Sequence, residues 1–284
     1  MDKQILKPLV SVVIPSYNHA SFVQDAIRSV INQTYENIEL IIIDDGSTDQ
    51  SLNKIEELMV ECKQRFVRFE FRHRSNKGLS NTLNEALDWA EGEYFCALAS
   101  DDQMLEEKTF IQLDIFKKNP MVSAVVGAHQ YIDNENRIIS IKKAPYKEFS
   151  FRDVFHHKHD IPASSQMIRC KNLRGIGGYN EKTMVEDWDL WLRLTEDGAK
   201  LVYIPDIIVS YRMHDNNLSK DKALMFNEVL ELVKRYKGYR GFPYAEYMVY
   251  KLYKVRPAKE KSYLLYLFLR LKYTFRYLIK SIRN

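Results

Sequence analysis

The sequence has little cysteine, and no two of its three cysteines form a CxxC pair. Cys62, Cys96 and Cys170 are odd in number and far apart, so neither a disulfide framework nor a cysteine zinc site is expected. Such usage is typical of a protein kept in a reducing compartment.

Long apolar runs are also missing. No stretch approaches the ~18 consecutive apolar residues of a membrane-spanning helix. The segment MDKQILKPLVSVVIP enters a strand-like run at once and lacks the basic start, the longer apolar core and the cleavage site of a signal peptide. We therefore expect a cytoplasmic location, either free or on the surface of a membrane.

Charge of one sign does not dominate, because 42 basic and 38 acidic residues leave a net charge of +4. A protein that binds nucleic acid normally carries a dense basic stripe, so this balance argues against a nucleic-acid partner. The glycine-rich phosphate loops GxGxxG and GxxxxGK are absent as well. Their absence disfavours a Rossmann dehydrogenase and a P-loop nucleotide-binding protein.

What is present is an alternation of short β-branched runs with segments of helical periodicity. The continuous apolar runs at residues 10–14 and 38–43 are typical of strands that are buried on both faces of a parallel sheet. A helix between them is expected to begin at a capping box of Ser21 and Gln24. Four further segments follow: a helix around residues 52–59, a strand at 66–71, a helix at 79–90 and a strand at 94–99. This order predicts a doubly wound α/β domain with a mostly parallel sheet.

The alternation loosens after Asp102. Four elements are expected there: a helix at 106–118, a strand at 122–126, a hairpin at 131–142 and a helix at 187–196. From residue 219 onward Tyr, Lys, Arg and Leu dominate. We expect a catalytic domain at residues 1–218 and a helical C-terminal extension at residues 219–284.

The end of this extension is predicted to be an amphipathic helix. At about 100° per residue, basic residues gather on one face and leucines on the opposite face. The basic residues are Lys272, Arg276, Lys280 and Arg283, the leucines are Leu264, Leu267, Leu271 and Leu278, and Tyr263, Tyr266, Tyr273 and Tyr277 share a flank. Such a helix is typical of an interfacial membrane anchor. The alternative is a helix whose apolar side packs on the protein core or on a partner subunit.

Three polar clusters follow predicted strands, at the edge where open parallel sheets bind ligands. They are Pro15-Ser16-Tyr17-Asn18, the DDGSTD segment from Asp44, and Ser100-Asp101-Asp102. Asp44 or Asp45 can accept hydrogen bonds from a nucleobase or a ribose. Asp101 and Asp102 can hold Mg²⁺ or Mn²⁺, which would neutralise the charge of a departing diphosphate. Each acidic cluster alone is equally compatible with an ordinary helix cap.

Two further clusters stand apart from these strand ends. Glu186-Asp187-Trp188-Asp189 lies at a predicted helix start, where a carboxylate can deprotonate an acceptor hydroxyl or simply interact well with the helix dipole. Residues 156–159 read His-His-Lys-His, but adjacent histidines on a loop do not readily converge on one ion. We expect this loop to be solvated and to lie on the acceptor side.

The order of these motifs resembles family 2 glycosyltransferases of the GT-A fold. The resemblance runs from about residue 10 to residue 219. It is carried by VSVVIPSYNHASFVQDAIRSVINQTYENIELIIIDDGSTDQS, by NKGLSNTLNEALDWAEGEYFCALASDD and by GGYNEKTMVEDWDLWLRL. It is strongest to the bacterial enzymes that assemble O-antigen, capsule or exopolysaccharide units.

The resemblance implies roles for particular residues. Those at the nucleotide-sugar donor would be Pro15, Tyr17, Asp44, Asp45, Lys77, Ser100, Asp101 and His214, with Asp45 facing the uracil and His214 reaching the diphosphate or the metal. Asp101 and Asp102 match the end of the family's DxD-type motif and would hold the cation. This sequence departs from that motif at its first position, which is Ala99. Asp187 matches the expected catalytic base.

The function that follows is an inverting transfer of a hexosyl or N-acetylhexosaminyl group from a nucleotide diphosphate, with UDP favoured by the resemblance. The acceptor would be a saccharide or a lipid-linked saccharide, and the cofactor Mn²⁺ or Mg²⁺. A nucleotidyltransferase is one alternative, although it usually carries a glycine-rich basic loop after the first strand. A non-catalytic module that binds nucleotide sugars is the other, since it would keep Asp45 without needing Asp187.

Overall fold

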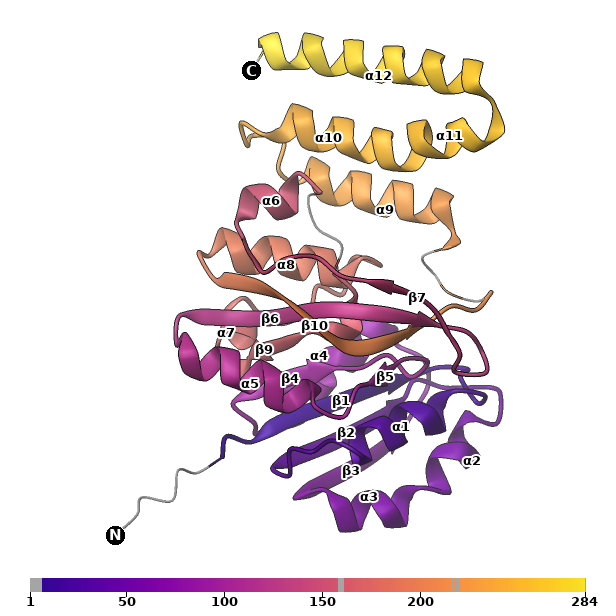
Figure 1. Ribbon diagram of the computed structural model, residues 1–284, viewed down its shortest axis with the longest axis vertical. Helices are drawn as coiled ribbons and strands as arrows, with labels where there is room; N and C mark the ends of the chain where they lie inside the picture. The colour runs from indigo at the N-terminus through magenta and orange to yellow at the C-terminus, as the bar shows by residue number, and fades with distance from the viewer. Residues whose placement is uncertain (1–6, 158–160, 216, 218–219, 284) are drawn as a thin grey trace.

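The computed structural model describes residues 7–157, 161–215, 217 and 220–283, and Figure 1 shows their arrangement. Within these residues, ten strands form one sheet with the order β3-β2-β1-β4-β9-β6-β10-β5, to which β7 and β8 add at β6 and β10. The strands are β1 Val10–Ser16, β2 Ile38–Asp44, β3 Arg68–His73, β4 Tyr94–Ala97, β5 Gln103–Met104, β6 Val122–Ile132, β7 Ile138–Lys142, β8 Lys147–Phe149, β9 Met167–Arg169 and β10 Lys200–Arg212.

The direction of the strands confirms the predicted mostly parallel sheet. β3, β2, β1 and β4 are parallel neighbours. β9 lies antiparallel between β4 and β6, and β10 is parallel to β6, so β6 and β10 run in the same direction as β1. Six strands therefore end at the same edge of the sheet, which is where ligands bind in such folds.

Helices cover both faces of the sheet. They are α1 Val23–Ile31, α2 Ser51–Glu56, α3 Met59–Arg65, α4 Leu79–Trp89, α5 Lys108–Lys118, α6 Phe151–Phe155, α7 Cys170–Gly175, α8 Glu186–Glu196, α9 Lys222–Lys234, α10 Phe242–Tyr250, α11 Arg256–Lys261 and α12 Tyr263–Arg283, with a short 3₁₀ turn η1 at Ala163–Ser165 and a π-helical turn η3 at Lys251–Val255. Neighbouring residues of β2 enter opposite cores: Ile41 belongs to the core that contains residues of α4 and α8, and Ile42 to the core that contains residues of α1 and α5. This explains the continuous apolar runs and confirms the doubly wound α/β class.

Several local expectations were wrong. Ser21 and Gln24 form no capping box, because α1 begins after Phe22 without a side-chain cap and the Gln24 amide donates instead to the carbonyl of Lys54. The helix expected around residues 52–59 is two short helices, α2 and α3. The strand expected to end at Val126 continues to Ile132, because β10 and β7 satisfy its backbone on both sides.

The cysteine expectation is confirmed for the thiols themselves: Cys62, Cys96 and Cys170 all lie in the described residues, are buried and form no disulfide. Across the described ranges, none of the helices has the length and the hydropathy needed to cross a membrane.

The four C-terminal helices stack above α8 in Figure 1, and α12 is the outermost. Val229 and Val233 of α9 and Ala245 and Val249 of α10 are buried in the same core as α8. The first helices of the extension are therefore part of the main packing unit. The expected boundary between residues 218 and 219 lies outside the described residues.

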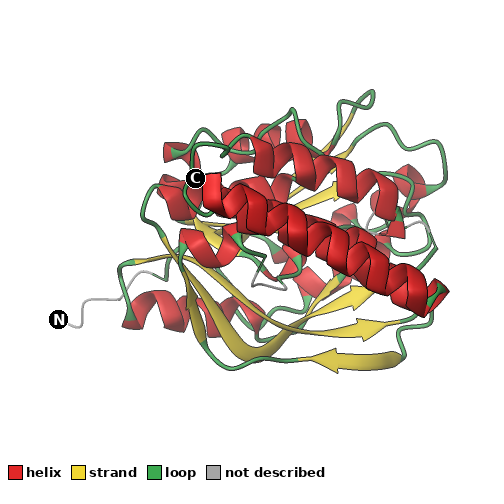
Figure 2. Ribbon diagram, turned by 90° about the horizontal axis from the view of Figure 1, so that it is seen from above, coloured by secondary structure: helices red, strands yellow, loops and turns green. Residues whose placement is uncertain are grey.

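The orientation of α12 is opposite to the one expected for its basic face. Arg276 and Lys280 turn inward and form ion pairs with the buried Glu246 of α10, at 3.1 and 2.6 Å. Tyr273 stacks on Tyr250 with ring centroids 4.3 Å apart. The outward side is an apolar stripe of Leu264, Phe268, Leu271, Phe275, Leu278 and Ile282, all exposed. Figure 2 views the molecule from above, with α12 lying across the other helices.

Candidate active site

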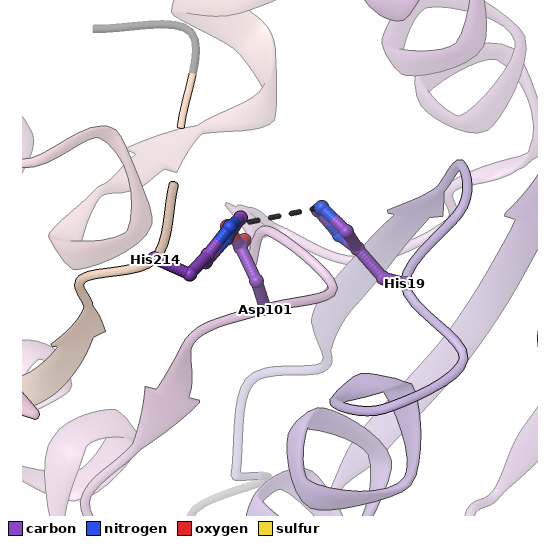
Figure 3. Close-up of side chains that lie close together, drawn as sticks. All are labelled: His19, Asp101 and His214. Carbon is purple, nitrogen blue, oxygen red and sulfur yellow. Dashed lines mark hydrogen bonds and ion pairs between the residues drawn. The ribbon is translucent and has the colours of Figure 1, made fainter. Parts of the chain in front are cut away.

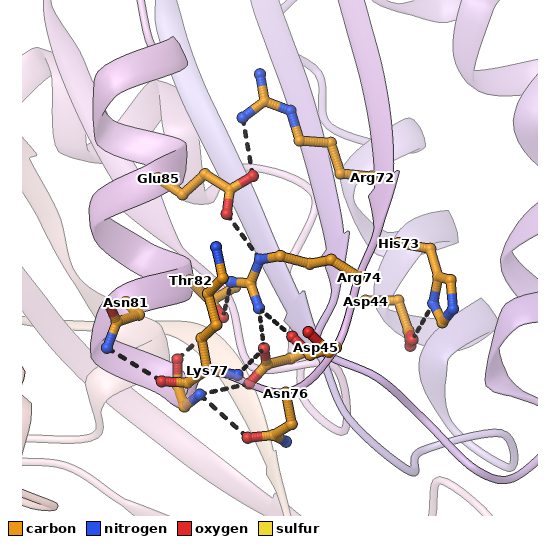
Figure 4. A network of polar contacts seen from close by, with 12 residues as sticks. Asp44, Asp45, Arg72, His73, Arg74, Asn76, Lys77, Asn81, Thr82 and Glu85 are labelled. Carbon is orange, nitrogen blue, oxygen red and sulfur yellow. Dashed lines mark hydrogen bonds and ion pairs between the residues drawn. The ribbon is translucent and has the colours of Figure 1, made fainter.

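The predicted donor residues lie at the edge where β1, β2 and β3 end. Asp45 follows β2 and is nearly buried. Its carboxylate accepts hydrogen bonds from the backbone N–H groups of Lys77 and Gly78, each at 2.8 Å, and pairs with the Arg74 guanidinium (Figure 4). Arg74 is held in turn by Glu85 of α4, at 2.7 Å. Asp45 thus fixes the loop between β3 and α4 against the end of β2.

Asp44 is committed to the protein itself. It is fully buried, and its carboxylate accepts hydrogen bonds from the Ser47 N–H at 2.9 Å, the Ser47 hydroxyl at 2.6 Å and the Ser16 hydroxyl at 3.2 Å. His73 Nδ1 lies 3.0 Å from the same carboxylate. We therefore assign Asp44 to the shape of the turn and not to contact with a ligand, which differs from the expectation that it meets the donor.

The turn after Asp45 requires glycine. Gly46 has φ +79°, and a Cβ atom there would lie 2.8 Å from the backbone nitrogen of Asn76. This close approach is what brings the loop of Lys77 against the end of β2.

The other predicted donor residues are placed around this turn. Pro15 lies in β1 beside Ile43, and the Tyr17 side chain that follows is 48% exposed. The Lys77 side chain is exposed. The Tyr17 and Lys77 side chains are thus open to solvent, as a residue that meets a ligand must be, whereas Pro15 is half-buried.

A second group of residues gathers beside the first. Among the described residues, one set of three side chains is arranged to hold a metal ion: His19, Asp101 and His214 offer ligand atoms within 4.8 Å of one another. His214 Nε2 lies 2.8 Å from Asp101 Oδ2, and His19 Nε2 lies 4.0 Å from the same oxygen (Figure 3). They come from the loop after β1, the loop after β4 and the segment after β10.

Neighbouring polar groups orient these three side chains. Ser100 Oγ lies 2.8 Å from His19 Nδ1, which leaves Nε2 facing Asp101. The Asn217 amide donates to Asp101 at 3.5 Å, and its oxygen accepts the backbone N–H of His214 at 2.7 Å. A partner such as Ser100, on the second ring nitrogen, fixes the ring orientation and tautomer of a metal-binding histidine. Ser100 is therefore better placed as a support for His19 than as a donor contact.

Charge also suits this cluster to a cation. Desolvation alone would raise the pKa of Asp101, but the hydrogen bond from His214 and the charge of His19 outweigh it and hold that pKa below its usual value. Burial lowers the pKa of His19, against the opposing influence of Asp101. At neutral pH the set offers an ionised carboxylate and a neutral His19 imidazole, which are the forms that bind metals.

Asp102 does not join Asp101 in this cluster. It is nearly buried, and its carboxylate accepts the backbone N–H of Arg212 at 2.9 Å and the hydroxyl of Ser164. Desolvation and the neighbouring charge of Asp101 raise its pKa well above the usual value. The structure thus replaces the expected pair of acidic metal ligands by Asp101 with two histidines.

Arg212 explains why Asp102 is held there. Its guanidinium is fully buried and donates to the backbone oxygens of Asp101 and Asp133, each at 2.8 Å, and to Asn136 and Asp25. This one side chain joins the loop after β4 to the β6–β7 turn and to α1. It therefore fixes the backbone that carries Asp101.

Asp187, the predicted base, lines a cavity of about 920 Å³. Its carboxylate accepts the N–H of Trp188 at 2.7 Å, in the first turn of α8. The other lining residues are mostly apolar or aromatic, among them Tyr131, Ile161, Val185, Trp188, Tyr211 and Met225. Ala163 and Met213 also line it and are the chain neighbours of Ser164 and His214, so the cavity reaches the segments that hold Asp102 and the metal cluster.

The two acids at the start of α8 share one environment. Desolvation and the charge of Asp187 raise the pKa of Glu186 to about 8. Desolvation also raises the pKa of Asp187, although the hydrogen bond from Trp188 opposes it. A carboxylate with a raised pKa is a stronger base than an exposed one, as general base catalysis requires.

The expectation for the histidine loop was wrong where the structure describes it. His156 and His157 are buried, not solvated: His156 packs on Tyr244 and His157 on Trp188, with ring centroids 4.6 and 4.2 Å apart. His157 also lines the cavity of Asp187. Residues 158 and 159 lie outside the described residues.

His19 is the site residue that sequence reasoning missed. It directly follows Asn18, the last residue of the first polar cluster, and Asn18 has φ +53°. That backbone conformation turns the chain after β1 and brings His19 back over Ser100. A histidine within a few residues of a strand end was the available signal.

Comparison with known proteins places the chain in a family. Residues 11–177 match the family model described as glycosyl transferase family 2. An uncharacterized glycosyltransferase of Rickettsia felis is 30% identical over 219 residues, which cover 75% of this chain and 35% of that protein. The chondroitin synthase of Escherichia coli is 30% identical over 220 residues, covering 76% of this chain and 30% of the synthase. The chain thus spans about a third of the length of these two relatives.

Solved structures show the same fold at low identity. The mannosyltransferase PcManGT from Pyrobaculum calidifontis, in complex with GDP-Man and Mn²⁺, superposes with a TM-score of 0.66 at 14% identity, covering 98% of this chain and 88% of that one. S. aureus TarS 1-349 in complex with UDP-GlcNAc gives 0.62 at 16% identity, covering 80% and 66%. Because the family model spans more than half of the chain and the fold agrees, the chain belongs to glycosyl transferase family 2 and has the GT-A fold.

Proposed function

We propose that the chain is a metal-dependent inverting glycosyltransferase that uses a nucleotide-sugar donor. The observation that carries this proposal is the cluster of His19, Asp101 and His214 at the sheet edge beside the Asp45 turn. A site that only bound a nucleotide would need the turn but not a built cation cluster. Two structural neighbours named above are complexes with GDP-Man and UDP-GlcNAc, which supports a donor of this class.

The cluster fits Mn²⁺ or Mg²⁺, and its two imidazoles favour Mn²⁺, since Mg²⁺ prefers oxygen ligands. Asp101, His19 and His214 would hold the cation. When bound, it would offset the negative charge that develops on the leaving diphosphate. We propose that the exposed Tyr17 and Lys77 side chains contact the nucleotide of the donor. The proposed nucleotide is UDP.

Asp187 is proposed as the general base. Its carboxylate would take the proton of an acceptor hydroxyl bound in the cavity, and that oxygen would attack the anomeric carbon in one displacement, which inverts the anomeric centre. The aromatic lining of the cavity suits a saccharide acceptor, whose ring faces are largely apolar. A role in building a surface polysaccharide follows from the resemblance and from the relatives, among which is a chondroitin synthase.

We further propose a cytoplasmic enzyme that docks on a membrane through the outward stripe of α12. Leu271 is 71% and Phe275 66% exposed, and both lie in a stripe that runs the length of the helix. Helix α12 contains no acidic residue, and its Lys272 is exposed. An anionic lipid surface matches both the stripe and this charge.

The test is hydrolysis of a panel of UDP-, GDP- and dTDP-sugars by the purified protein with Mn²⁺. We expect one nucleotide sugar to be hydrolysed, and the Asp101→Asn variant to lose this hydrolysis at Mn²⁺ concentrations that suffice for the original chain. Binding without turnover under any condition would identify a non-catalytic module. Release of pyrophosphate from a nucleoside triphosphate would identify a nucleotidyltransferase.

A further inference from the structure

A second cavity lies between the π-helical turn η3, α11 and α12, away from the donor site. Its volume is about 410 Å³, and it is lined by Tyr247, Lys251, Val255, Arg256, Lys259, Tyr266 and Arg270. Four of these side chains are cationic and none is acidic. The phenol of Tyr266 accepts a hydrogen bond from Arg270 at 3.3 Å.

The four cations of this cavity are not neutralised by the protein. Within the described residues, none of them lies within 4.0 Å of a carboxylate, whereas Arg276 and Lys280 on the same helix both pair with Glu246. From residue 251 to the end the sequence has ten lysines and arginines and a single acidic residue, Glu260, which does not line the cavity. Three of the four cations, Arg256, Lys259 and Arg270, are exposed to solvent, so an anion from solution can reach them, and an anion bound among them would reduce the repulsion between their like charges.

The position of the cavity relates it to Asp187. Arg256 lines both this cavity and the larger one that contains Asp187. Tyr266 and Arg270 belong to α12, whose opposite side carries the exposed apolar stripe. From the outer surface of the protein inward, the apolar stripe of α12 comes first, the basic cavity second and the cavity of Asp187 third.

We propose that the basic cavity binds the phosphate or diphosphate group of a lipid phosphate ester, and that this lipid is the acceptor. The inference rests on the proposed function, because it places the sugar carried by that phosphate beside Asp187. Guanidinium groups recognise phosphate through paired hydrogen bonds and lysines add point charge, so the residue types suit this ligand. An anionic phospholipid of the bilayer offers the same phosphate chemistry, but nothing in it would occupy the cavity of Asp187.

The test measures binding of inorganic pyrophosphate and of farnesyl diphosphate by calorimetry in EDTA, which removes cation-dependent binding at the donor site. The double variant Lys259→Gln, Arg270→Gln, whose two positions line the basic cavity but not the cavity of Asp187, is compared with Lys261→Gln, Lys272→Gln, which removes the same charge from exposed positions outside both cavities. We expect the first variant to lose at least about tenfold in affinity for both probes, and the second to bind like the original chain. Equal affinity in all three proteins, or no binding by the original chain, would overturn the proposal.

A second measurement separates the two sources of phosphate. If the ligand is the acceptor, both double variants should sediment equally with vesicles of phosphatidylcholine and phosphatidylglycerol, and only the cavity variant should lose farnesyl diphosphate. If vesicle binding falls in the cavity variant alone, the cavity takes a bilayer headgroup and the acceptor assignment is wrong. Hydrolysis of the nucleotide sugar without acceptor should be unchanged in both variants. If the original chain hydrolyses no nucleotide sugar, the proposed function fails, whatever the binding experiments show.

Discussion

His214 Nε2 lies 2.8 Å from the carboxylate of Asp101, although 113 residues separate the two in sequence. The contact forms because β4 and β10 are both directed toward the same edge of the sheet. With His19 it turns three unrelated loops into one candidate cation site.

Metal dependence is the first prediction. EDTA should abolish hydrolysis of the donor, and Mn²⁺ should restore it. Asp101→Asn should raise the Mn²⁺ concentration for half activity at least about tenfold, because it removes the charged ligand. Asp215→Asn is the matched control, since that exposed carboxylate pairs with Lys220 and should leave the requirement unchanged. Full activity of the original chain in metal-free buffer would exclude this role for the cluster.

Replacement of the proposed base gives the second prediction. Asp187→Asn should lower turnover by roughly 10²–10⁴-fold, because it keeps the shape but cannot accept the proton. Binding of UDP, measured by calorimetry, should change little. Asp197→Asn, at the exposed end of the same helix, should behave like the original chain. A variant that kept its rate but lost UDP would make Asp187 a donor ligand.

The dependence of rate on pH is the third prediction. A base works deprotonated, and the pKa values of Asp187 and Glu186 are both raised, the latter to about 8. Activity should therefore fall as the pH drops, with a midpoint above the usual carboxyl range. Glu186→Gln removes the acid whose pKa is about 8, so a midpoint near that pH should disappear, whereas a midpoint that belongs to Asp187 should remain because desolvation raises its pKa. A midpoint near 4 in both proteins would show that no raised carboxyl controls the rate.

The turn after β2 supplies the fourth prediction. Gly46→Ala should destabilise the fold by about 1–3 kcal/mol and weaken UDP binding, since alanine strains the positive φ and meets the backbone of Asn76. Urea unfolding and calorimetry measure the two effects. Gly175→Ala is the control, because a Cβ there meets nothing within 4 Å. Equal stability of both variants would contradict the close approach.

Membrane docking is the fifth prediction. Leu271→Gln with Phe275→Gln should reduce sedimentation with anionic vesicles without lowering thermal stability, because both side chains are exposed. Val60→Gln with Met121→Gln removes as many exposed apolar side chains elsewhere and should sediment normally. A loss of dimer in ultracentrifugation, with vesicle binding unchanged, would instead identify the stripe as a contact between copies.

The sequence was most informative about features that depend on the residues of a single strand or helix. Continuous apolar runs predicted the strands of the parallel sheet, and the acids at strand ends predicted the edge that carries the site. It was least informative where partners lie far apart in the chain. Periodicity divided α12 into a basic and an apolar side, but it could not show that Glu246 of α10 attracts Arg276 and Lys280 inward.

The same limit applies to the acidic pairs. Asp44 and Asp45 are equivalent in sequence, and only the positions of Ser16, Ser47 and the Lys77 loop decide which carboxylate is committed to the turn. Asp101 and Asp102 differ because Arg212 and Ser164 hold the second one. The spacing of residues along the sequence does not show which acid of each pair is held by neighbouring protein groups.

The cluster of His19, Asp101 and His214 also has a thermodynamic consequence for folding. A ligand that binds only the folded state adds to its stability, by about 2.7 kcal/mol at a hundred times its dissociation constant. A cation held here would join the loop after the first strand to the segment after the last one, so it would close almost the whole catalytic chain into a single cooperative unit. Local unfolding of either the loop after β1 or the segment after β10 would then have to release the ion. The two segments would therefore unfold together.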